Sequence, residues 1–177
     1  MRSNSVKTLT QCALLAALSA ICAWISIPGP GGISFTLQSF AIALTLGLLG
    51  GKNGAITIGV YLLLGLVGAP VFSGFRGGLG ALLDASGGYL LGFPVFALVY
   101  WLISALPLPK KAAQPVALAA GMVCCYLFGA AWYTLVYLPT GSSFLFALGV
   151  YVLPYVLPDA LKLALAYYLS RKLRQFV

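Results

Sequence analysis

The chain of 177 residues contains only two acidic side chains, and each has a basic side chain near it in the sequence. Asp159 precedes Lys162 by three residues in the run LPDALKLALA, so on a helix both would lie on one face. A carboxylate accepts hydrogen bonds and an ammonium group donates them, so the pair can bind a polar ligand. Charge within an apolar helix is costly and usually faces a cavity. A ligand contact is therefore favoured over the alternative, a structural ion pair.

The second pair, Arg76 and Asp84, lies in the segment PVFSGFRGGLGALLDASGGYLLGF, residues 70–93, which contains seven glycines. Glycine permits tight turns and a close approach of the backbone, which suits a lid folded over a pocket. Each of these charges could contact a ligand or simply be solvated in a loop. Two interpretations are also open for Gln38: it could contact a ligand or form a hydrogen bond to a neighbouring helix.

The composition indicates the elements that hold these residues. Apolar residues make up 62% of the chain and charged residues 7%, whereas a soluble domain needs about a quarter charged residues. Repeated long apolar runs are typical of helices that cross about 30 Å of hydrocarbon. We predict an all-α polytopic protein of the cell membrane, a single domain over 1–177 with the lipid bilayer as its solvent. The six predicted spans are residues 7–27, 35–50, 54–69, 87–106, 116–138 and 158–174.

Short polar or glycine- and proline-rich breaks separate these spans, including a turn at GKN, residues 51–53. The last third is less regular, because Pro154 and Pro158 interrupt its apolar run. Proline is favoured at the start of a helix and disfavoured inside one. We therefore predict a short helix over 144–153 near the interface, with the sixth span starting at Pro158.

Basic residues predict the orientation of the chain, because cytoplasmic loops carry an excess of Lys and Arg. With the N-terminus inside, only Arg76 lies outside and Lys162 lies within a span. Both termini are then cytoplasmic, and the glycine-rich loop between the third and fourth spans faces outward. The remaining basic residues lie on the inner side: Arg2, Lys7, Lys52, Lys110, Lys111, Arg171, Lys172 and Arg174.

Several functions are disfavoured by what the sequence lacks. The net charge of +8 comes from basic residues placed singly at span ends, which is unlike a nucleic-acid interface. The stretch LGLLGGKN departs from a nucleotide-binding loop at Leu46 and Asn53. The chain has no histidine, and its four cysteines lie within spans without metal-binding spacing. We expect no cofactor, no metal, no nucleic-acid partner and no enzymatic activity in this chain.

Three segments, TLQ, GLVGAPVF and GGYLLGF, occur in this order, and LPDALKLALA follows near the C-terminus. Together they resemble the biotin-specific substrate-binding (S) components of energy-coupling factor (ECF) transporters, the BioY family, over nearly the whole chain. One departure concerns Asp84, Ala85 and Ser86, where family members usually show Gly, Pro and Thr or Ser. The role of Asp84 is therefore open.

The resemblance implies a six-helix subunit that captures biotin and passes it to a membrane coupling (T) protein and two cytoplasmic ATPases. Some family members work without that module. Asp159 would accept from the ureido N–H groups of biotin, Gln38 would donate and accept, and Lys162 or Arg76 would neutralise its carboxylate. Phe72 and Tyr89 would form hydrophobic walls. The alternatives are another vitamin as ligand, or a membrane assembly subunit that transports nothing.

Small residues in the first span provide a candidate partner surface. Ala13, Ala17 and Ala20 stand at i, i+4 and i+7, so on a helix they would form one smooth stripe that lets another helix approach closely. Packing within the chain's own bundle explains the spacing equally well. The family resemblance favours contact with the coupling protein, because S components are thought to present a small-residue face of this helix.

The predicted orientation can be tested by labelling. In a cysteine-free background, the substitutions Gly74→Cys and Ser142→Cys should each react with an impermeant maleimide on intact cells, because both positions are expected outside. Ala112→Cys should react only after permeabilisation. Labelling of that variant on intact cells would show that the orientation is inverted.

Overall fold

The computed structural model describes residues 2–107, 109–137 and 143–175, and helices make up most of them. Two short strands, β1 (Ser26–Ile27) and β2 (Phe35–Thr36), pair antiparallel between the first two helices, and the 3-10 turns η1 (Pro30–Gly32) and η2 (Ser73–Phe75) lie in loops. The α-helices are α1 (Arg2–Trp24), α2 (Gln38–Leu66), α3 (Leu79–Leu83), α4 (Gly87–Ser104), α5 (Lys110–Val136), α6 (Phe144–Tyr151) and α7 (Leu153–Leu173).

Within the described residues, four helices are long and apolar enough to cross a membrane: Val6–Trp24 of α1, then α2, α4, and Ala112–Val136 of α5. Helices α6 and α7 together form a further candidate span, bent by 52° at their junction. An apolar exterior is what a bilayer solvates, and large side chains on these helices are indeed exposed. The all-α, multi-pass character is confirmed at this level. Examples of the exposed residues are Leu14, Leu63, Leu102, Leu135 and Leu161.

Helix α2 contains most of the second and third predicted spans, but residues 35–36 form β2 and residues 67–69 lie beyond the end of the helix. Only Gly50 inside it departs from helical geometry, with φ 75° and ψ −177°, which glycine adopts at little cost. The predicted turn at 51–53 is therefore wrong, because those residues are already helical and the break lies at Gly50. A single residue without a Cβ suffices to redirect the chain, so the two arms of α2, residues 38–49 and 51–66, need no longer loop.

Helices α5 and α7 begin earlier than predicted, and proline misled the prediction in both. Helix α5 begins at Lys110 instead of 116, and α7 begins at Leu153 instead of Pro158. Pro115 and Pro158 lie within the first two turns, where each removes one backbone hydrogen bond without ending the helix. Pro154 occupies the first turn of α7, whose N–H groups have no intrahelical acceptor. The predicted end of the fifth span, at 138, lies outside the described residues.

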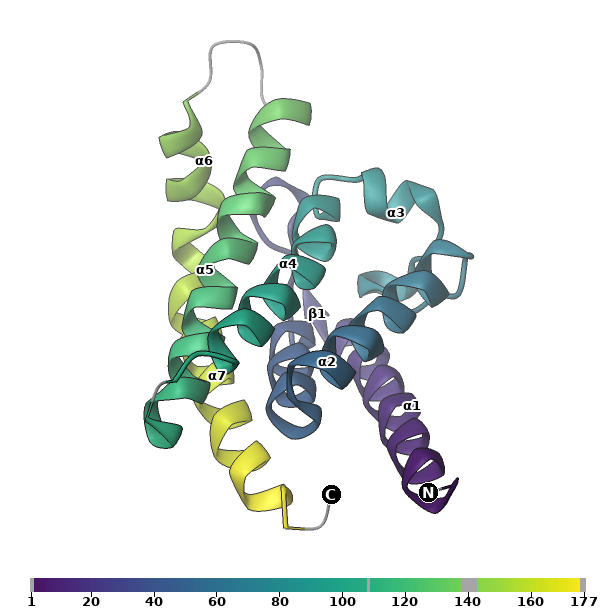
Figure 1. Ribbon diagram of the computed structural model, residues 1–177. Coiled ribbons are helices and arrows are strands. Elements are labelled where there is room, and N and C mark those ends of the chain that lie inside the picture. Colours follow the sequence, from purple (N-terminus) through teal and green to yellow (C-terminus); the bar gives the residue numbers. More distant parts are fainter. Residues whose placement is uncertain (1, 108, 138–142, 176–177) are drawn as a thin grey trace.

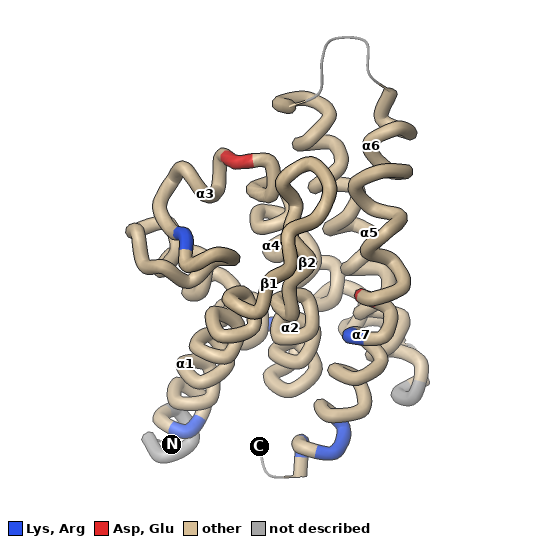
Figure 2. Tube along the Cα trace, turned by 180° about the vertical axis from the view of Figure 1, so that it is seen from behind, with Lys and Arg blue, Asp and Glu red and all other residues tan. Residues whose placement is uncertain are grey.

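The helices pack around α2, which contacts α1, α4 and α7, while α4 runs along α5 (Figure 1). The N and C labels lie at one end of the molecule, opposite the end where α5 finishes and α6 begins (Figure 1). Several basic residues lie near the two chain ends, and acidic residues are drawn at only two places in the trace (Figure 2). The loop that holds η2 and α3 lies on the same side of the bundle as α1 and α2, and η2 contacts α1 (Figure 1).

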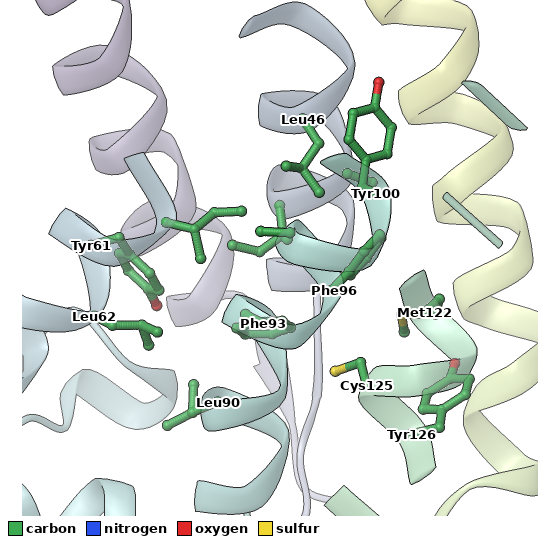
Figure 3. Close-up of a cluster of buried hydrophobic side chains, with 14 of the residues drawn as sticks. Leu46, Tyr61, Leu62, Leu90, Phe93, Phe96, Tyr100, Met122, Cys125 and Tyr126 are labelled. Carbon is green, nitrogen blue, oxygen red and sulfur yellow. The ribbon is translucent and has the colours of Figure 1, made fainter. Parts of the chain in front are cut away.

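The core lies along α4, between α2 on one side and α5 on the other, and it combines aliphatic and aromatic side chains (Figure 3). Glycines let α4 and α5 approach closely, as small residues do in membrane helices. A Cβ at Gly92 would lie 2.8 Å from the sulfur of Cys125, and one at Gly121 would lie 2.3 Å from the Phe96 ring. The small residues therefore position the two helices that carry much of the cavity described below.

A second close contact joins α2 to the C-terminal end of α7. The Arg174 guanidinium donates through Nε and Nη2 to the Gly47 carbonyl, at 3.0 and 2.8 Å, three residues before the break at Gly50. A cation is favourable at the C-terminal end of a helical segment, where carbonyls lack partners. Beside it, Gln114 Nε2 donates to Ser170 Oγ at 2.7 Å. These contacts tie α2, α5 and α7 together at the end opposite the cavity.

Replacing Gly47 tests the close packing of α2 against α7. In Gly47→Ala the new Cβ would lie 2.7 Å from Ser170 Cβ, so we expect overpacking to destabilise the fold by about 1–3 kcal/mol. The control is Gly59→Ala in the other arm of α2, where a Cβ meets nothing within 4 Å and should be neutral or slightly stabilising. Thermal unfolding in detergent measures both, and equal midpoints would contradict the close approach.

Candidate binding site

A cavity lies among the β1–β2 hairpin, the start of α2, the loop that holds η2 and α3, helices α4, α5 and α7, and the last residue of α6. Six of the seven predicted ligand residues line it: Gln38, Phe72, Arg76, Tyr89, Asp159 and Lys162. Asp84 is absent from the lining. The other lining residues are Ile33, Ser34, Thr36, Ser39, Ser73, Ala81, Ser86, Leu90, Phe93, Met122, Cys125, Tyr126, Tyr151 and Tyr155.

Asp159 is buried in the cavity wall and receives three hydrogen bonds. Its Oδ1 accepts from the Ser39 hydroxyl at 2.7 Å and from Lys162 Nζ at 2.8 Å, and its Oδ2 accepts from the Tyr126 hydroxyl at 2.5 Å. Lys162 Nζ donates in addition to the Thr36 carbonyl at 2.6 Å. Asp159 and Lys162 thus form the ion pair that the sequence left as the alternative, within α7, and Ser39 of α2 and Tyr126 of α5 add hydrogen bonds to its carboxylate.

These bonds leave a defined capacity for a ligand. An ionised carboxylate has about four acceptor positions and an ammonium group three donors. Ser39, Tyr126 and Lys162 occupy three positions on Asp159, and Lys162 has used two of its donors. One acceptor position of Asp159 and one N–H of Lys162 remain, on side chains that contact each other. This combination can bind a group in which an N–H stands next to a carbonyl oxygen.

Gln38 lines the cavity and also forms a hydrogen bond to the other arm of α2, while its contact with a ligand stays a prediction. Its Nε2 donates to the Tyr61 hydroxyl at 2.6 Å, and Tyr61 donates to the Val71 carbonyl at 2.9 Å. The Tyr61 ring also meets Phe72 edge to face, with centroids 5.7 Å apart. This chain of contacts connects the first turn of α2 to the loop after it. The amide side chain is thereby oriented beside the Asp159 cluster.

Aromatic side chains form the apolar walls. Phe72 is fully buried and packs against Gly65, where a Cβ would lie 1.9 Å from the ring, so its position is closely defined. The Tyr89 hydroxyl donates to the Tyr151 carbonyl at 3.0 Å. On the hairpin side, Phe35 stacks on Tyr155 with centroids 4.0 Å apart. A flat, partly apolar ligand would contact these rings.

The loop contributes the second charged pair. Arg76 lines the cavity, its Nε donates to the Ser73 carbonyl at 3.2 Å, and its Nη1 forms an ion pair with Asp84 Oδ2. Both side chains are partly exposed, at 43% and 36%. Asp84 therefore acts on the cavity through Arg76, and the predicted direct contact between Asp84 and a ligand has no support in the lining.

Sequence reasoning missed Ser39, Tyr126 and Tyr155. A periodic signal was available for Tyr126, because it precedes Tyr133 and Tyr137 by seven and eleven residues and so shares a helix face with them. The hydroxyls of Tyr126, Tyr133 and Tyr137 each donate to another element of the fold. Tyr126 donates to Asp159, Tyr133 to the Gly31 carbonyl at 3.2 Å, and Tyr137 to the Leu83 carbonyl. A tyrosine stripe on an apolar helix was therefore a sign of polar partners on neighbouring elements.

The small-residue stripe of α1 is divided in the structure. Ala13 and Ala17 are exposed, but Ala20 is only 6% exposed and Ala16 only 5%. Ala20 packs in the core, so it cannot belong to a partner surface. The reason is the helical rotation of about 100° per residue, which turns position i+7 slightly towards the bundle. The exposed surface is reduced to Ala13 and Ala17.

The BioY family model matches this chain over residues 1–177. The biotin transporter BioY of Thermotoga maritima is 35% identical over 157 residues, 89% of this chain and 80% of that protein. The probable biotin transporter BioY of Pyrococcus horikoshii is 33% identical over 168 residues, 95% of this chain and 96% of that protein.

Solved structures agree with these sequence relatives. The crystal structure of an S-component for biotin from an ECF-type ABC transporter superposes with a TM-score of 0.83 at 27% identity, covering 99% of this chain and 94% of that one. A second structure, the S component of a bacterial ECF transporter, shares the fold with a TM-score of 0.69 at 17% identity. The sequence, its resemblance and the helical cavity lead to one conclusion: the chain belongs to the BioY family.

Proposed function

We propose that this protein captures biotin at the outer face of the cell membrane and takes it up as the substrate-binding subunit of an ECF-type transporter. The observation that carries the proposal is the buried Asp159–Lys162 pair, which lines a cavity with aromatic walls in a chain of this family. The protein is a transport subunit and not an enzyme, so ATP hydrolysis belongs to separate partners.

The chemistry of biotin fits the groups in the cavity. Its ureido ring presents N–H groups beside a carbonyl oxygen, which match the remaining acceptor of Asp159 and the remaining donor of Lys162. Gln38 can bond the other edge of the same ring, and Phe72 and Tyr89 can contact the fused apolar ring. Since Lys162 is already held by Asp159 and the Thr36 carbonyl, we assign the tail carboxylate to Arg76.

The membrane arrangement follows from the same proposal. We retain cytoplasmic termini and six crossings, counting the two arms of α2 separately, with the glycine-rich loop outside as a lid. The partners are a membrane coupling (T) protein and two cytoplasmic ATPases, and transport without them is the variant reported for some of the family. The alternative functions are the transport of a different vitamin and a membrane assembly role without a ligand.

Calorimetry with biotin on the detergent-purified protein tests the ligand. Asp159→Asn keeps the shape of the side chain but removes the charged acceptor, so biotin binding should weaken by about 1.5–3 kcal/mol. The control is Thr45→Val, which removes a buried hydroxyl that bonds only its own helix, to the Ala41 carbonyl, and should leave binding unchanged.

The outcomes separate the alternatives. Unchanged biotin affinity in Asp159→Asn would restrict this residue to a structural role. Binding of a different vitamin in place of biotin would identify a different cargo, and absence of binding to every vitamin in a panel would favour the assembly subunit. A thermal scan of each variant confirms that a loss of binding is not a loss of fold.

The exposed part of α1 predicts the partner surface. The double substitution Ala13→Trp with Ala17→Trp should leave biotin binding near wild type, because neither residue lines the cavity, and should abolish co-purification with the coupling protein. The matched control is Ala160→Trp with Ala164→Trp, an exposed alanine pair of the same spacing on α7. Retained co-purification of the α1 variant, or equal loss in the control, would exclude this surface.

A further inference from the structure

The ion pair between Arg76 and Asp84 stands at the edge of the cavity, and one of its members lines the cavity while the other does not. We propose that Asp84 is an exchangeable counter-ion, which competes with the carboxylate of the ligand for Arg76 and so determines how strongly the site prefers a charged tail over an uncharged one. The inference rests on the proposed function, because it concerns the tail of the same ligand.

The charges around the cavity are balanced without a ligand carboxylate. Its lining contains two cations, Arg76 and Lys162, and each forms an ion pair with one of the two acidic residues of the chain. Among the described lining residues, a carboxylate that enters therefore meets no cation without a counter-ion. It can gain a strong contact only where an existing pair is able to open.

The two pairs differ in how easily they can open. Asp159 and Lys162 have side chains 8% and 15% exposed, and Ser39 and Tyr126 also hold the carboxylate, so opening that pair would leave a buried charge uncompensated. Arg76 and Asp84 are 43% and 36% exposed, and such pairs contribute little because water solvates the separated charges. Arg76 is therefore the cation that a ligand carboxylate can capture.

The backbone around Asp84 is held by contacts that do not need its charge. The Trp132 Nε1 donates to the Asp84 carbonyl at 3.3 Å, and the Tyr137 hydroxyl donates to the Leu83 carbonyl. The side chain adds one local bond, in which Oδ1 accepts from the Ala85 N–H at 2.7 Å, and an asparagine oxygen would preserve it. The negative charge of Asp84 thus has Arg76 as its main partner.

Arg76 has anchors that persist when its counter-ion exchanges. Its Nε donates to the Ser73 carbonyl at 3.2 Å, and Nη2 lies 3.5 Å from the Ser86 hydroxyl. The planar guanidinium can then present its remaining N–H groups to a carboxylate, including in a two-bond arrangement. A charged tail must replace Asp84 to make this contact, whereas an uncharged tail leaves the pair intact. Asp84 therefore reduces the advantage of the charged tail.

The test compares biotin with biotin amide, which differs only in the charge and hydrogen bonding of its tail. In Asp84→Asn, biotin should bind about two- to fivefold tighter, because Arg76 no longer has a competing carboxylate, and binding of the amide should stay unchanged. Arg76→Gln should weaken the binding of biotin relative to the binding of its amide. Adding Asp84→Asn to Arg76→Gln should then leave the ratio of the two affinities unchanged.

Asp84→Ser removes the same carboxylate by a different substitution and should shift the ratio of affinities in the same direction. The proposal is overturned if the affinities for biotin and its amide change equally, or if their ratio stays at its wild-type value in either Asp84 variant. It is also overturned if the shift in this ratio persists in the Arg76→Gln background. Such results with intact biotin binding would leave the proposed function standing. Failure of the wild-type protein to bind either ligand would instead refute the proposed function.

Discussion

The burial of one negative charge is the constraint on which the structure depends. Transfer of an unpaired carboxylate into an apolar interior is very unfavourable, so Asp159 requires donors wherever the chain places it. Ser39 of α2, Tyr126 of α5 and Lys162 of α7 supply them. Three helices must therefore meet at one point, and the hydrogen bonds to Asp159 from Ser39 and Tyr126 define their relative positions more narrowly than apolar packing could, because lipid solvates apolar side chains as well as the protein interior does.

The fold provides this meeting point through a few close contacts. Gly50 breaks α2, so that one arm carries Gln38 and Ser39 to the cavity and the other carries Tyr61 to the loop. Arg174 and the small residue Gly47 join the opposite end of α7 to α2. The cavity thus has rigid helical walls on one side. On the other side lie the hairpin and the loop, which tyrosine hydroxyls attach through backbone carbonyls.

Charge placement explains how such a site can bind a ligand and still release it. The buried pair has the geometry to recognise a polar ring, and it stays intact because its members are held from several helices. The pair at the edge is partly exposed and therefore weaker, and it is the pair that we propose exchanges partners. A binding subunit needs both, since recognition requires preorganised groups whereas entry and release require a part of the site that can open.

The sequence alone determined the properties that depend on composition and local spacing. Apolar runs indicated the membrane helices, and the motifs identified the family, both of which the structure and comparisons confirm. The spacing of Asp159 and Lys162 placed them on one helix face, where they form an ion pair, while the ligand contact favoured for them stays a prediction. Tertiary structure decided what depends on distant partners. Tyr126 reaches Asp159 from another helix, Ala20 turns into the core, and Asp84 faces Arg76 instead of the cavity. Helices also continue through Pro115 and Pro158, because packing with neighbouring helices outweighs the loss of one backbone hydrogen bond.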